Sequence, residues 1–332
     1  MKIDFVISWV DGSDPAWRKE KYQYMGAEEP DAGDERYRDM GILKYWFRAV
    51  EAYAPWVDQI HFITWGHLPQ WLNTEHPKLR IVNHKDYIPE EYLPTFSSRP
   101  IELNLHRIPG LNEHFVYFND DMLLNAPITP EFFFKNGLPC DFAHINNLYN
   151  SNPIDVYEHT RVNCTWITNN QHSYIKAFFR HPLKYVNLCY PLKNNIKNIL
   201  TLENAGIFQG FEEHHLPSAY LKATLAETWE ESTKFLHYTC AHKFRTPLDV
   251  NQCVFRYKQL AQGRFYPVSK KLRGKYVFLK NAISSITADI LDSSHKMLCI
   301  NDVPDLPNYE EIAAAVTQAY EQKLPNKSAF EK

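Results

Sequence analysis

One short stretch constrains the fold of this chain more than any other: residues 114–121, which read HFVYFNDD. Valine, tyrosine and phenylalanine favour a pleated backbone, and an uninterrupted apolar run of this kind is typical of an interior strand of a parallel sheet. Asn119, Asp120 and Asp121 follow at the carboxyl end of the predicted strand, where open α/β sheets bind their ligands. Two adjacent carboxylates repel each other, so we interpret the triplet as a site for a hard cation such as Mg²⁺. The alternative is a solvated turn, because asparagine and aspartate are common turn residues.

The rest of the chain alternates between strand and helix patterns. Further strands are predicted at residues 3–10, 60–64, 79–82 and 298–300, and helices at residues 43–53, 101–108, 218–232, 249–260 and 309–322. This alternation predicts an α/β fold with a parallel or mixed sheet. The chain has 332 residues, of which 44% are hydrophobic, and no proline-rich or glycine-rich linker divides it. We therefore expect one elaborated domain over residues 1–310, followed by a C-terminal helix and a frayed tail over residues 311–332.

Candidate functional residues in the first half lie at strand ends or share a helix face. Asp11 follows the first predicted strand and so belongs at the same sheet edge as the acidic triplet, unless it serves only the local turn. Arg38 belongs near this edge, and an arginine can bind a phosphate with two parallel hydrogen bonds. Glu102 and His106 lie one turn apart on the predicted helix 101–108, so they share a face.

The second half gathers basic and histidine residues without the spacing of a zinc site. A histidine pair precedes Pro217, and the segment HKFRTPLD adds further basic side chains. A lone histidine is usually structural, but several cationic groups near one another favour chemistry. A second Asn-Asp pair follows the late strand. The candidates in this half are His215, Lys243, Arg245, Asn301 and Asp302.

Charge, cysteine content and hydropathy exclude several classes of protein. The net charge is −3 with mixed signs, so no global field attracts nucleic acid, and no nucleic-acid partner is expected. Six scattered cysteines without a C-x-x-C pair indicate reduced thiols. The amino terminus lacks the apolar core of a signal peptide, and no apolar run approaches the roughly 18 residues of a membrane span. We expect a cytoplasmic protein, with room for peripheral contact at the inner face of the membrane.

Four blocks of sequence become recognisable when these segments are read together. They are IDFVISWVDGSDPAW, then RYRDMGILKYWFRAVEAYAPW through LPTFSSRPIELNLHRIPGLNEHFVYFNDDMLL, then HHLPSAYLKATL with HKFRTPLDVN, and finally LCINDVPD. Together they resemble the Stealth family of hexose-1-phosphate transferases, which includes bacterial capsular polysaccharide phosphotransferases and the catalytic part of the eukaryotic GlcNAc-1-phosphotransferase α/β subunit. The blocks cover most of residues 3–123, about 205–260 and 295–305. The resemblance is specific because it rests on all four blocks together and not on any single one.

The resemblance implies a catalytic domain with a Rossmann-like sheet, similar to that of nucleotide-sugar transferases. It implies a UDP-sugar donor and an acceptor hydroxyl on a glycan or a lipid-linked oligosaccharide. That hydroxyl attacks the phosphorus nearest the sugar, UMP leaves, and a phosphodiester joins the two sugars in a capsular or cell-surface polysaccharide. Peripheral contact with membrane-bound polysaccharide synthesis machinery would follow from such an acceptor. Residues 130–200 match weakly, so we expect acceptor recognition there.

Roles for matching positions follow from the charge that develops in phosphoryl transfer, which requires cations and positioning more than covalent chemistry. The resemblance implies Mg²⁺ or Mn²⁺ on Asp120 and Asp121, with Asp302 as a helper. His215 is the first candidate for the general base and Asp11 the second, since an imidazole titrates near neutral pH. The expected substrate-binding residues, which neutralise the diphosphate or orient the site, are Arg38, Glu102, His106, Lys243, Arg245 and Asn301.

Two other functions remain open on the residues alone. The first is a metal-dependent glycosyltransferase that makes an ordinary glycosidic bond and releases UDP. The second is a glycan-binding protein whose carboxylates hold structural Ca²⁺. The identity of the leaving nucleotide separates the two enzymes, and turnover of a UDP-sugar separates both from a binding protein.

Overall fold

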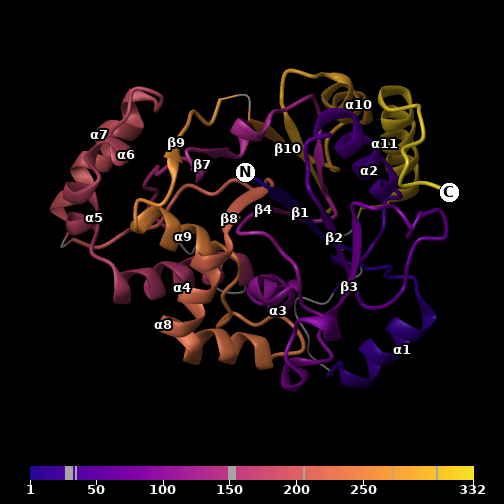
Figure 1. The fold of residues 1–332 in the computed structure, drawn as a ribbon, viewed down its shortest axis with the longest axis horizontal. Coiled ribbons are helices and arrows are strands. Elements are labelled where there is room, and N and C mark those ends of the chain that lie inside the picture. Colours follow the sequence, from indigo (N-terminus) through magenta and orange to yellow (C-terminus); the bar gives the residue numbers. More distant parts are fainter. Residues whose placement is uncertain (27–32, 34–35, 149–154, 205, 272, 304–305) are drawn as a thin grey trace.

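The computed structural model describes residues 1–26, 33, 36–148, 155–204, 206–271, 273–303 and 306–332. Its main sheet has the strand order β3-β2-β1-β4-β8 and lies at the centre of the molecule (Figure 1). β1 pairs in parallel with β2 and β4, and β2 pairs in parallel with β3, whereas β8 runs antiparallel to β4. The strand bounds are β1 Ile3–Ser8, β2 Ile60–Thr64, β3 Leu79–Asn83, β4 His114–Phe118 and β8 Ser218–Leu221. The predicted α/β fold with a mixed sheet is confirmed.

Two smaller sheets extend this framework. One has the order β10-β11-β5, and the other has the order β6-β7-β9. β5 comes directly after the acidic triplet and pairs antiparallel with β11. The β10-β11-β5 sheet therefore ties the late strand β11 to the chain that leaves β4. The bounds are β5 Met122–Leu124, β6 Phe134–Lys135, β7 Leu138–Asp141, β9 Tyr266–Pro267, β10 Gly274–Phe278 and β11 Met297–Asn301.

One face of the main sheet is covered by the helices α2, α10 and α11. Phe5 and Phe118 project from neighbouring strands to this side, and their ring centroids lie 4.8 Å apart. Trp46 of α2 packs on Phe118 at 5.4 Å, and β5 and β11 contribute Leu123 and Ile300 to the same core. The large aromatic side chains thus fill a core rather than a binding surface. The helix bounds are α2 Leu43–Tyr53, α10 Ile283–Leu291 and α11 Tyr309–Lys323.

The C-terminal tail belongs to this core, and our expectation of a frayed end was wrong. Phe330 is buried, and Glu331 forms two hydrogen bonds of 2.8 and 2.9 Å with the guanidinium of Arg48 in α2. A backbone bridge joins Leu72 to Glu331. Burying a large ring and a paired carboxylate outweighs the fraying that lysine-rich composition suggested.

The other face of the main sheet carries α3, α4, α8 and α9. Residues 218–221 form the edge strand β8 and not the start of the predicted helix 218–232, because they complete the ladder beside β4 with Tyr220 buried. The helix begins at Lys222. Tertiary pairing here overrides a local helical pattern. The bounds on this side are α3 Ser98–Leu103, α4 Val156–Gln171, α8 Lys222–Ala241 and α9 Cys253–Ala261.

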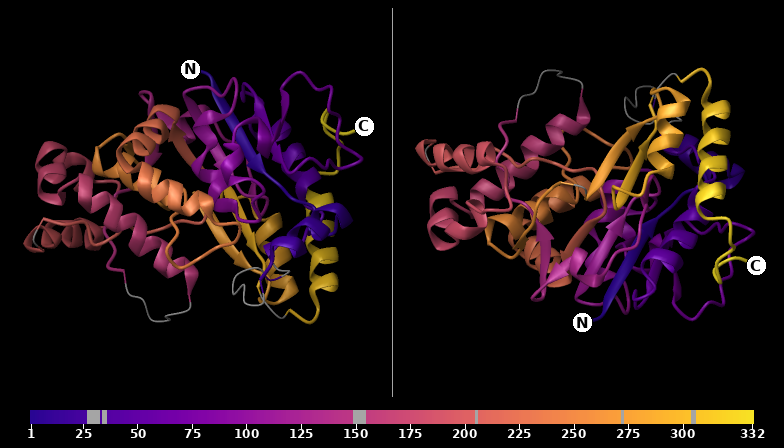
Figure 2. Two further views of the ribbon diagram at one scale, coloured as in Figure 1. Left: turned by 90° about the horizontal axis from the view of Figure 1, so that it is seen from below. Right: turned by 90° about the horizontal axis from the view of Figure 1, so that it is seen from above.

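Three short helices form a lobe at one end of the molecule. They are α5 Tyr174–Arg180, α6 Pro182–Tyr185 and α7 Leu192–Leu200, and all views in Figures 1 and 2 place them beyond the sheet, at the end opposite α11. Tyr174 and Tyr185 connect the lobe to the core of the second face. The remaining helix, α1, spans Pro15–Tyr24 and follows β1, with Asp14 as its N-cap.

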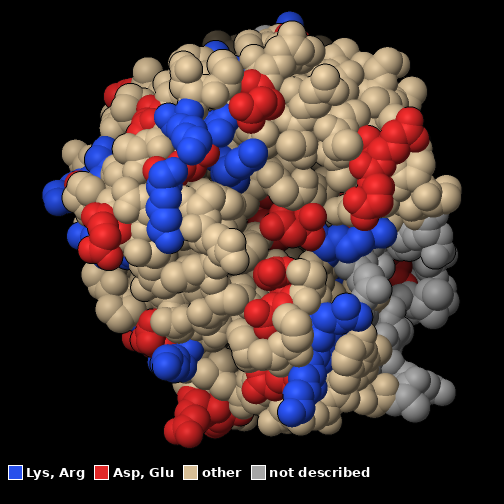
Figure 3. Space-filling model, turned by 90° about the vertical axis from the view of Figure 1, so that its right-hand side faces the viewer, with Lys and Arg blue, Asp and Glu red and all other residues tan. Residues whose placement is uncertain are grey.

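Acidic and basic side chains intermingle on the face that Figure 3 shows, at the end of the molecule away from the lobe. This mixture agrees with the small net charge of the chain. Within the described part of the chain, no helix is both long and apolar enough to cross a bilayer.

Candidate active site

The carboxyl ends of β1 and β4 meet at one edge of the main sheet, because these strands pair in parallel. Asp11 follows β1, and Asn119, Asp120 and Asp121 follow β4. Asp39 also lies close enough to interact with Asp11 and Asp120. Enclosure by the protein, together with the charges of Asp121 and Asp39, raises the pKa of Asp120 to about 8. The structure therefore gathers four carboxylates whose charges oppose one another.

Asp121 lies at the centre of a smaller cluster. Its Oδ2 lies 3.4 Å from His215 Nε2 and accepts a hydrogen bond of 3.2 Å from the Cys299 thiol. Its Oδ1 is buried without a hydrogen-bond donor in the described part of the chain. One ligand atom from each of the three residues lies within 4.8 Å of the others. This arrangement resembles a cation site more than a solvated turn.

The chemistry of these residues fits a divalent cation. A positive charge would offset both the burial and the repulsion that raise the pKa of Asp120, and it would satisfy the unpartnered oxygen of Asp121. Carboxylate oxygens are the ligands that Mg²⁺ and Mn²⁺ prefer. Burial and the neighbouring Asp121 raise the pKa of the Cys299 thiol, so this side chain is a protonated hydrogen-bond donor. Asp120 and Asp121 would hold the ion, and Cys299 would support Asp121.

Replacing Cys299 by serine is expected to keep metal-dependent activity within about threefold, since a hydroxyl can also donate to Asp121 and a hard cation does not require sulfur. The measurement is turnover against Mg²⁺ and Mn²⁺ concentration for both proteins. A large rise in the metal concentration needed for half-maximal rate would contradict this expectation and make Cys299 a ligand.

Arg38 and Asp302 lie together, but in this conformation they bind each other. Arg38 Nε and Nη2 lie 2.9 and 2.8 Å from Asp302 Oδ2, and the backbone N–H of Val303 donates to Oδ1 at 2.7 Å. Asn301 donates from its side chain to the carbonyl of Asp302 at 2.8 Å. The helper-ligand role of Asp302 and the phosphate-binding roles of Arg38 and Asn301 therefore stay predictions, each requiring these contacts to change when substrate binds.

His215 reaches Asp121 from the segment between Phe211 and β8. Burial lowers the pKa of its imidazole, but attraction to Asp121 outweighs burial and raises the pKa above the ordinary value. The ring also packs against Tyr276 of β10 at 5.7 Å. With Nε2 directed at a carboxylate, the orientation of the imidazole is fixed in the manner expected of a general base or acid.

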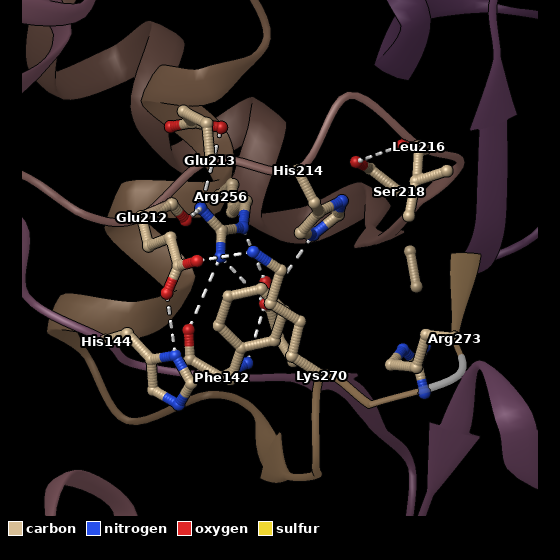
Figure 4. A network of polar contacts seen from close by, with 12 residues as sticks. Phe142, His144, Glu212, Glu213, His214, Leu216, Ser218, Arg256, Lys270 and Arg273 are labelled. Carbon is tan, nitrogen blue, oxygen red and sulfur yellow. Dashed lines mark hydrogen bonds and ion pairs between the residues drawn. The ribbon is translucent and has the colours of Figure 1, made fainter. Parts of the chain in front are cut away.

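A buried network holds this segment in place (Figure 4). Arg256 of α9 forms hydrogen bonds of 2.8 and 2.9 Å with the Asp141 carboxylate. It also donates to the carbonyl of Glu212 at 3.1 Å and lies 3.6 Å from the Glu213 carboxylate. His214 lies 3.7 Å from Asp141. These residues anchor the backbone immediately before His215. The sequence pointed to His214 as part of the histidine pair but did not single out Asp141, Arg256 or the glutamates.

Replacing Asp141 by asparagine is expected to lower the free energy of unfolding by about 3–5 kcal/mol, because the buried Arg256 guanidinium loses the carboxylate that accepts two of its short hydrogen bonds and keeps only Glu213 at 3.6 Å as a counter-charge. Urea unfolding followed by circular dichroism measures the change. Asp289→Asn is the matched control: Asp289 pairs with the partly exposed Lys275, so about 1 kcal/mol or less is expected. Equal decreases in the free energy of unfolding in both variants would show that the buried Asp141 pair stabilises the protein no more than an exposed ion pair does.

Glu102 and Arg245 come together beneath this edge. Glu102 is buried in α3 and accepts a backbone hydrogen bond from Gln252 at 3.3 Å. Burial raises its pKa, while nearby Arg245 and a hydrogen bond from Ser98 oppose that rise. Arg245 in turn donates to the Ser98 hydroxyl at 3.1 Å. The charge of Glu102 also acts on His215, so the pair lies within electrostatic reach of the imidazole.

His106 lies elsewhere. The predicted helix 101–108 ends at Leu103, where Asn104 folds its side chain back onto the Pro100 carbonyl at 2.8 Å. His106 therefore does not share a face with Glu102. It packs on Trp229 and lies near Lys222, which follows β8 at the edge opposite the carboxylates. A structural role fits it better than the orienting role predicted for it.

Two further candidates lie at the carboxylate edge with local partners. Asp11 Oδ1 accepts from the backbone and hydroxyl of Ser13 at 2.9 and 2.6 Å, as in an ordinary turn. Lys243 donates to the carbonyl of Leu93 at 3.0 Å. Next to it, Phe244 packs in a small cluster with Trp65, which follows β2. Their predicted chemical roles stay predictions.

Three family models match separate parts of the chain. Stealth protein CR1, conserved region 1, matches residues 1–29; CR2, conserved region 2, matches residues 36–141; and CR4, conserved region 4, matches residues 288–332. The capsular polysaccharide phosphotransferase WcwK of Streptococcus pneumoniae is 42% identical over 99% of this chain and 99% of its own length. The chain belongs to the Stealth family. Because its relatives over the full chain are phosphotransferases, this Stealth protein is a transferase.

Other Stealth relatives match over similar lengths. The receptor polysaccharide phosphotransferase WefC of Streptococcus oralis is 37% identical over 99% of both chains. The exopolysaccharide phosphotransferase cps2G of Lactiplantibacillus plantarum is 36% identical over 99% of this chain and 96% of its own length. Among solved structures, the galactosyltransferase LgtC aligns with a TM-score of 0.40 and 11% identity over 98% of both chains. Mouse xyloside xylosyltransferase 1 aligns with a TM-score of 0.36 and 12% identity, covering 90% of this chain and 97% of that one.

Proposed function

We propose that this Stealth protein transfers a hexose-1-phosphate or an N-acetylhexosamine-1-phosphate from a UDP-sugar to a hydroxyl of a glycan acceptor. The product is a phosphodiester in a capsular or cell-surface polysaccharide, and the leaving group is UMP. The observation that carries the proposal is the 3.4 Å approach of His215 to Asp121 at the carboxyl edge of the sheet. This contact supports our assignment of His215 as the base and of Asp121 as a cation ligand, and the relatives named polysaccharide phosphotransferases support the reaction class.

In the proposed reaction, the acceptor oxygen bonds to the phosphorus nearest the sugar, and the bond from that phosphorus to the oxygen of UMP breaks. His215 takes the proton of the acceptor hydroxyl on Nδ1, because its Nε2 faces Asp121. Asp120 and Asp121 would hold Mg²⁺ or Mn²⁺, which would supply charge neutralisation on the diphosphate. Arg38, Lys243 and Arg245 add positive charge around it, with Arg38 exchanging Asp302 for phosphate.

Neighbouring residues hold the proposed catalytic and substrate-binding side chains in position. Glu102 holds Arg245 in position through their mutual attraction and the shared Ser98 hydroxyl. The Asp141 and Arg256 pair fixes the backbone that presents His215. Lining residues from 130–200, the weakly matching region, would select the acceptor.

The decisive experiment incubates the protein with a panel of UDP-sugars, Mg²⁺ and a polysaccharide acceptor. Release of UMP and a phosphodiester resonance in the phosphorus-31 NMR spectrum of the polymer are expected. Release of UDP without a diester would instead establish an ordinary glycosyltransferase. Binding of glycan and Ca²⁺ without turnover of any donor would establish a binding protein.

A further inference from the structure

The helical lobe, residues 174–200, concentrates exposed large hydrophobic side chains: among the described residues it carries eight of 21. Leu188 is fully exposed, and Leu183, Leu192 and Phe179 are 77%, 75% and 69% exposed. Ile175, Ile196, Ile199 and Leu200 of the lobe are exposed as well. Single exposed leucines are normal on a protein surface, but a concentration on one small lobe indicates contact with something apolar.

Helix α7 shows that this exposure follows from how the lobe is attached. A surface helix normally buries its apolar face, yet α7 turns a polar residue, Asn198, to the body of the protein. Asn198 accepts from the backbone of Ile145 at 3.0 Å and donates to the carbonyls of Ala143 and Tyr185 at 2.7 Å each. The apolar positions 192, 196, 199 and 200, which share a helix face, are thereby left in contact with solvent.

The same segment is strongly basic. Residues 173–203 contain one acidic residue, Glu203, and five basic ones: Lys176, Arg180, Lys184, Lys193 and Lys197. The whole chain has slightly more acidic than basic residues, 39 against 36, and the opposite end of the molecule mixes both signs (Figure 3). Local excess positive charge beside exposed leucines is the composition of protein surfaces that rest on anionic lipid.

We propose that the lobe docks on the surface of an anionic lipid bilayer, with the leucine and isoleucine side chains entering the headgroup region and Lys176 and Lys193 pairing with lipid phosphates. Lys184 and Lys197 instead donate to groups of the protein itself. Charge favours this occupant over a second copy of the chain. In a symmetric contact between two lobes, their basic side chains would face one another and repel. An uncharged partner would leave those same charges without compensation.

Docking at this lobe would also bear on the chemistry. The chain that leaves the lobe continues through Phe211 to His215, so the membrane-facing element is continuous in sequence with the proposed base. An acceptor attached to a lipid could then reach the site without leaving the bilayer. The docking proposal itself does not depend on which bond the enzyme makes.

Vesicle flotation of the full-length protein tests the proposal. Vesicles containing phosphatidylglycerol are expected to carry the protein upward, and pure phosphatidylcholine vesicles to carry much less. Leu183→Ser with Leu188→Ser and Leu192→Ser should reduce binding to the anionic vesicles by about tenfold or more. Lys176→Gln with Lys193→Gln should reduce binding several-fold, and added salt should weaken binding of the wild type in the same direction.

The controls use exposed residues outside the lobe. Leu291→Ser, on the opposite side of the molecule, and Lys19→Gln on α1 should bind vesicles as the wild type does. Binding of a UDP-sugar, measured by calorimetry without any acceptor, should be unchanged in all the lobe variants, and their thermal unfolding should match the wild type. This separates a failure of docking from a loss of the donor site or of the fold. Equal binding by wild type and the triple leucine variant would overturn the proposal. So would a wild-type dimer, seen by light scattering, that the leucine substitutions dissociate without any vesicle binding.

Discussion

Asp121→Asn should lower metal-dependent turnover by about 10³-fold or more while leaving the fold intact. The substitution keeps the size of the side chain but removes the charge from the carboxylate that lies between His215 and Cys299. Charge neutralisation by a bound cation is the main contribution that a protein makes to phosphoryl transfer, so its loss cannot be offset locally. UMP release, measured across a range of Mg²⁺ and Mn²⁺ concentrations, gives the effect.

Two companion variants make this result interpretable. Asp289→Asn, at a surface ion pair, should keep full activity and shows that an Asp to Asn change is not harmful in itself. Asp120→Asn shows which of the adjacent carboxylates carries more of the cation binding. Wild-type activity and metal dependence in Asp121→Asn, with thermal unfolding unchanged, would remove Asp121 from the metal site.

His215→Ala has the second-largest expected effect, a fall in kcat of about 10²- to 10⁴-fold with a smaller change in donor KM. A general base acts in the transition state, so its removal lowers the rate more than it weakens substrate binding. Because a base must be unprotonated, wild-type kcat/KM should rise with pH on the acidic side. The attraction of Asp121 raises the pKa of His215. The increase of kcat/KM with pH should therefore be centred above the ordinary pKa of histidine. A bound cation that neutralises Asp121 would shift this centre back toward lower pH.

The matched variant is His295→Ala, at a histidine whose ring contacts the neighbouring Ser294 and which has no part in the proposed chemistry. It should retain wild-type rates. If His215→Ala raises only the donor KM, then His215 binds substrate and Asp11 becomes the next candidate for the base. Loss of the acidic limb of the pH profile in His215→Ala would support its assignment directly.

Much of the fold could be predicted because the strands of the sheet carry their signals locally. The apolar run 114–118 and the strand 60–64 lie where their residue types place them, and parallel pairing then follows from alternating helices. The predictions that were wrong depend on contacts between residues far apart in the sequence. Residues 218–221 look helical in isolation but complete the edge of a sheet, and the tail is ordered by Arg48, which lies far away in sequence.

The site was predictable to the extent that its residues follow strands. Asp120 and Asp121 follow β4, and their place at the ligand edge follows from that alone. The ion pair of Arg38 with Asp302 and the approach of Cys299 to Asp121 depend on how β11 packs beside β5, which no local pattern encodes. Asp39 stood next to Arg38 in a recognised block, and a count of carboxylates per sheet edge would have drawn attention to it.

The contact between Arg48 and Glu331 also bears on how the protein is made. These residues are 283 positions apart, and the core that α2 covers is completed by α11 and Phe330. During synthesis the first strands and α2 leave the ribosome long before residues 309–332 exist. One side of the main sheet must therefore wait, with aromatic side chains uncovered, until the last segment is translated. A nascent chain stalled before residue 309 should be a good client for chaperones that bind exposed apolar surface.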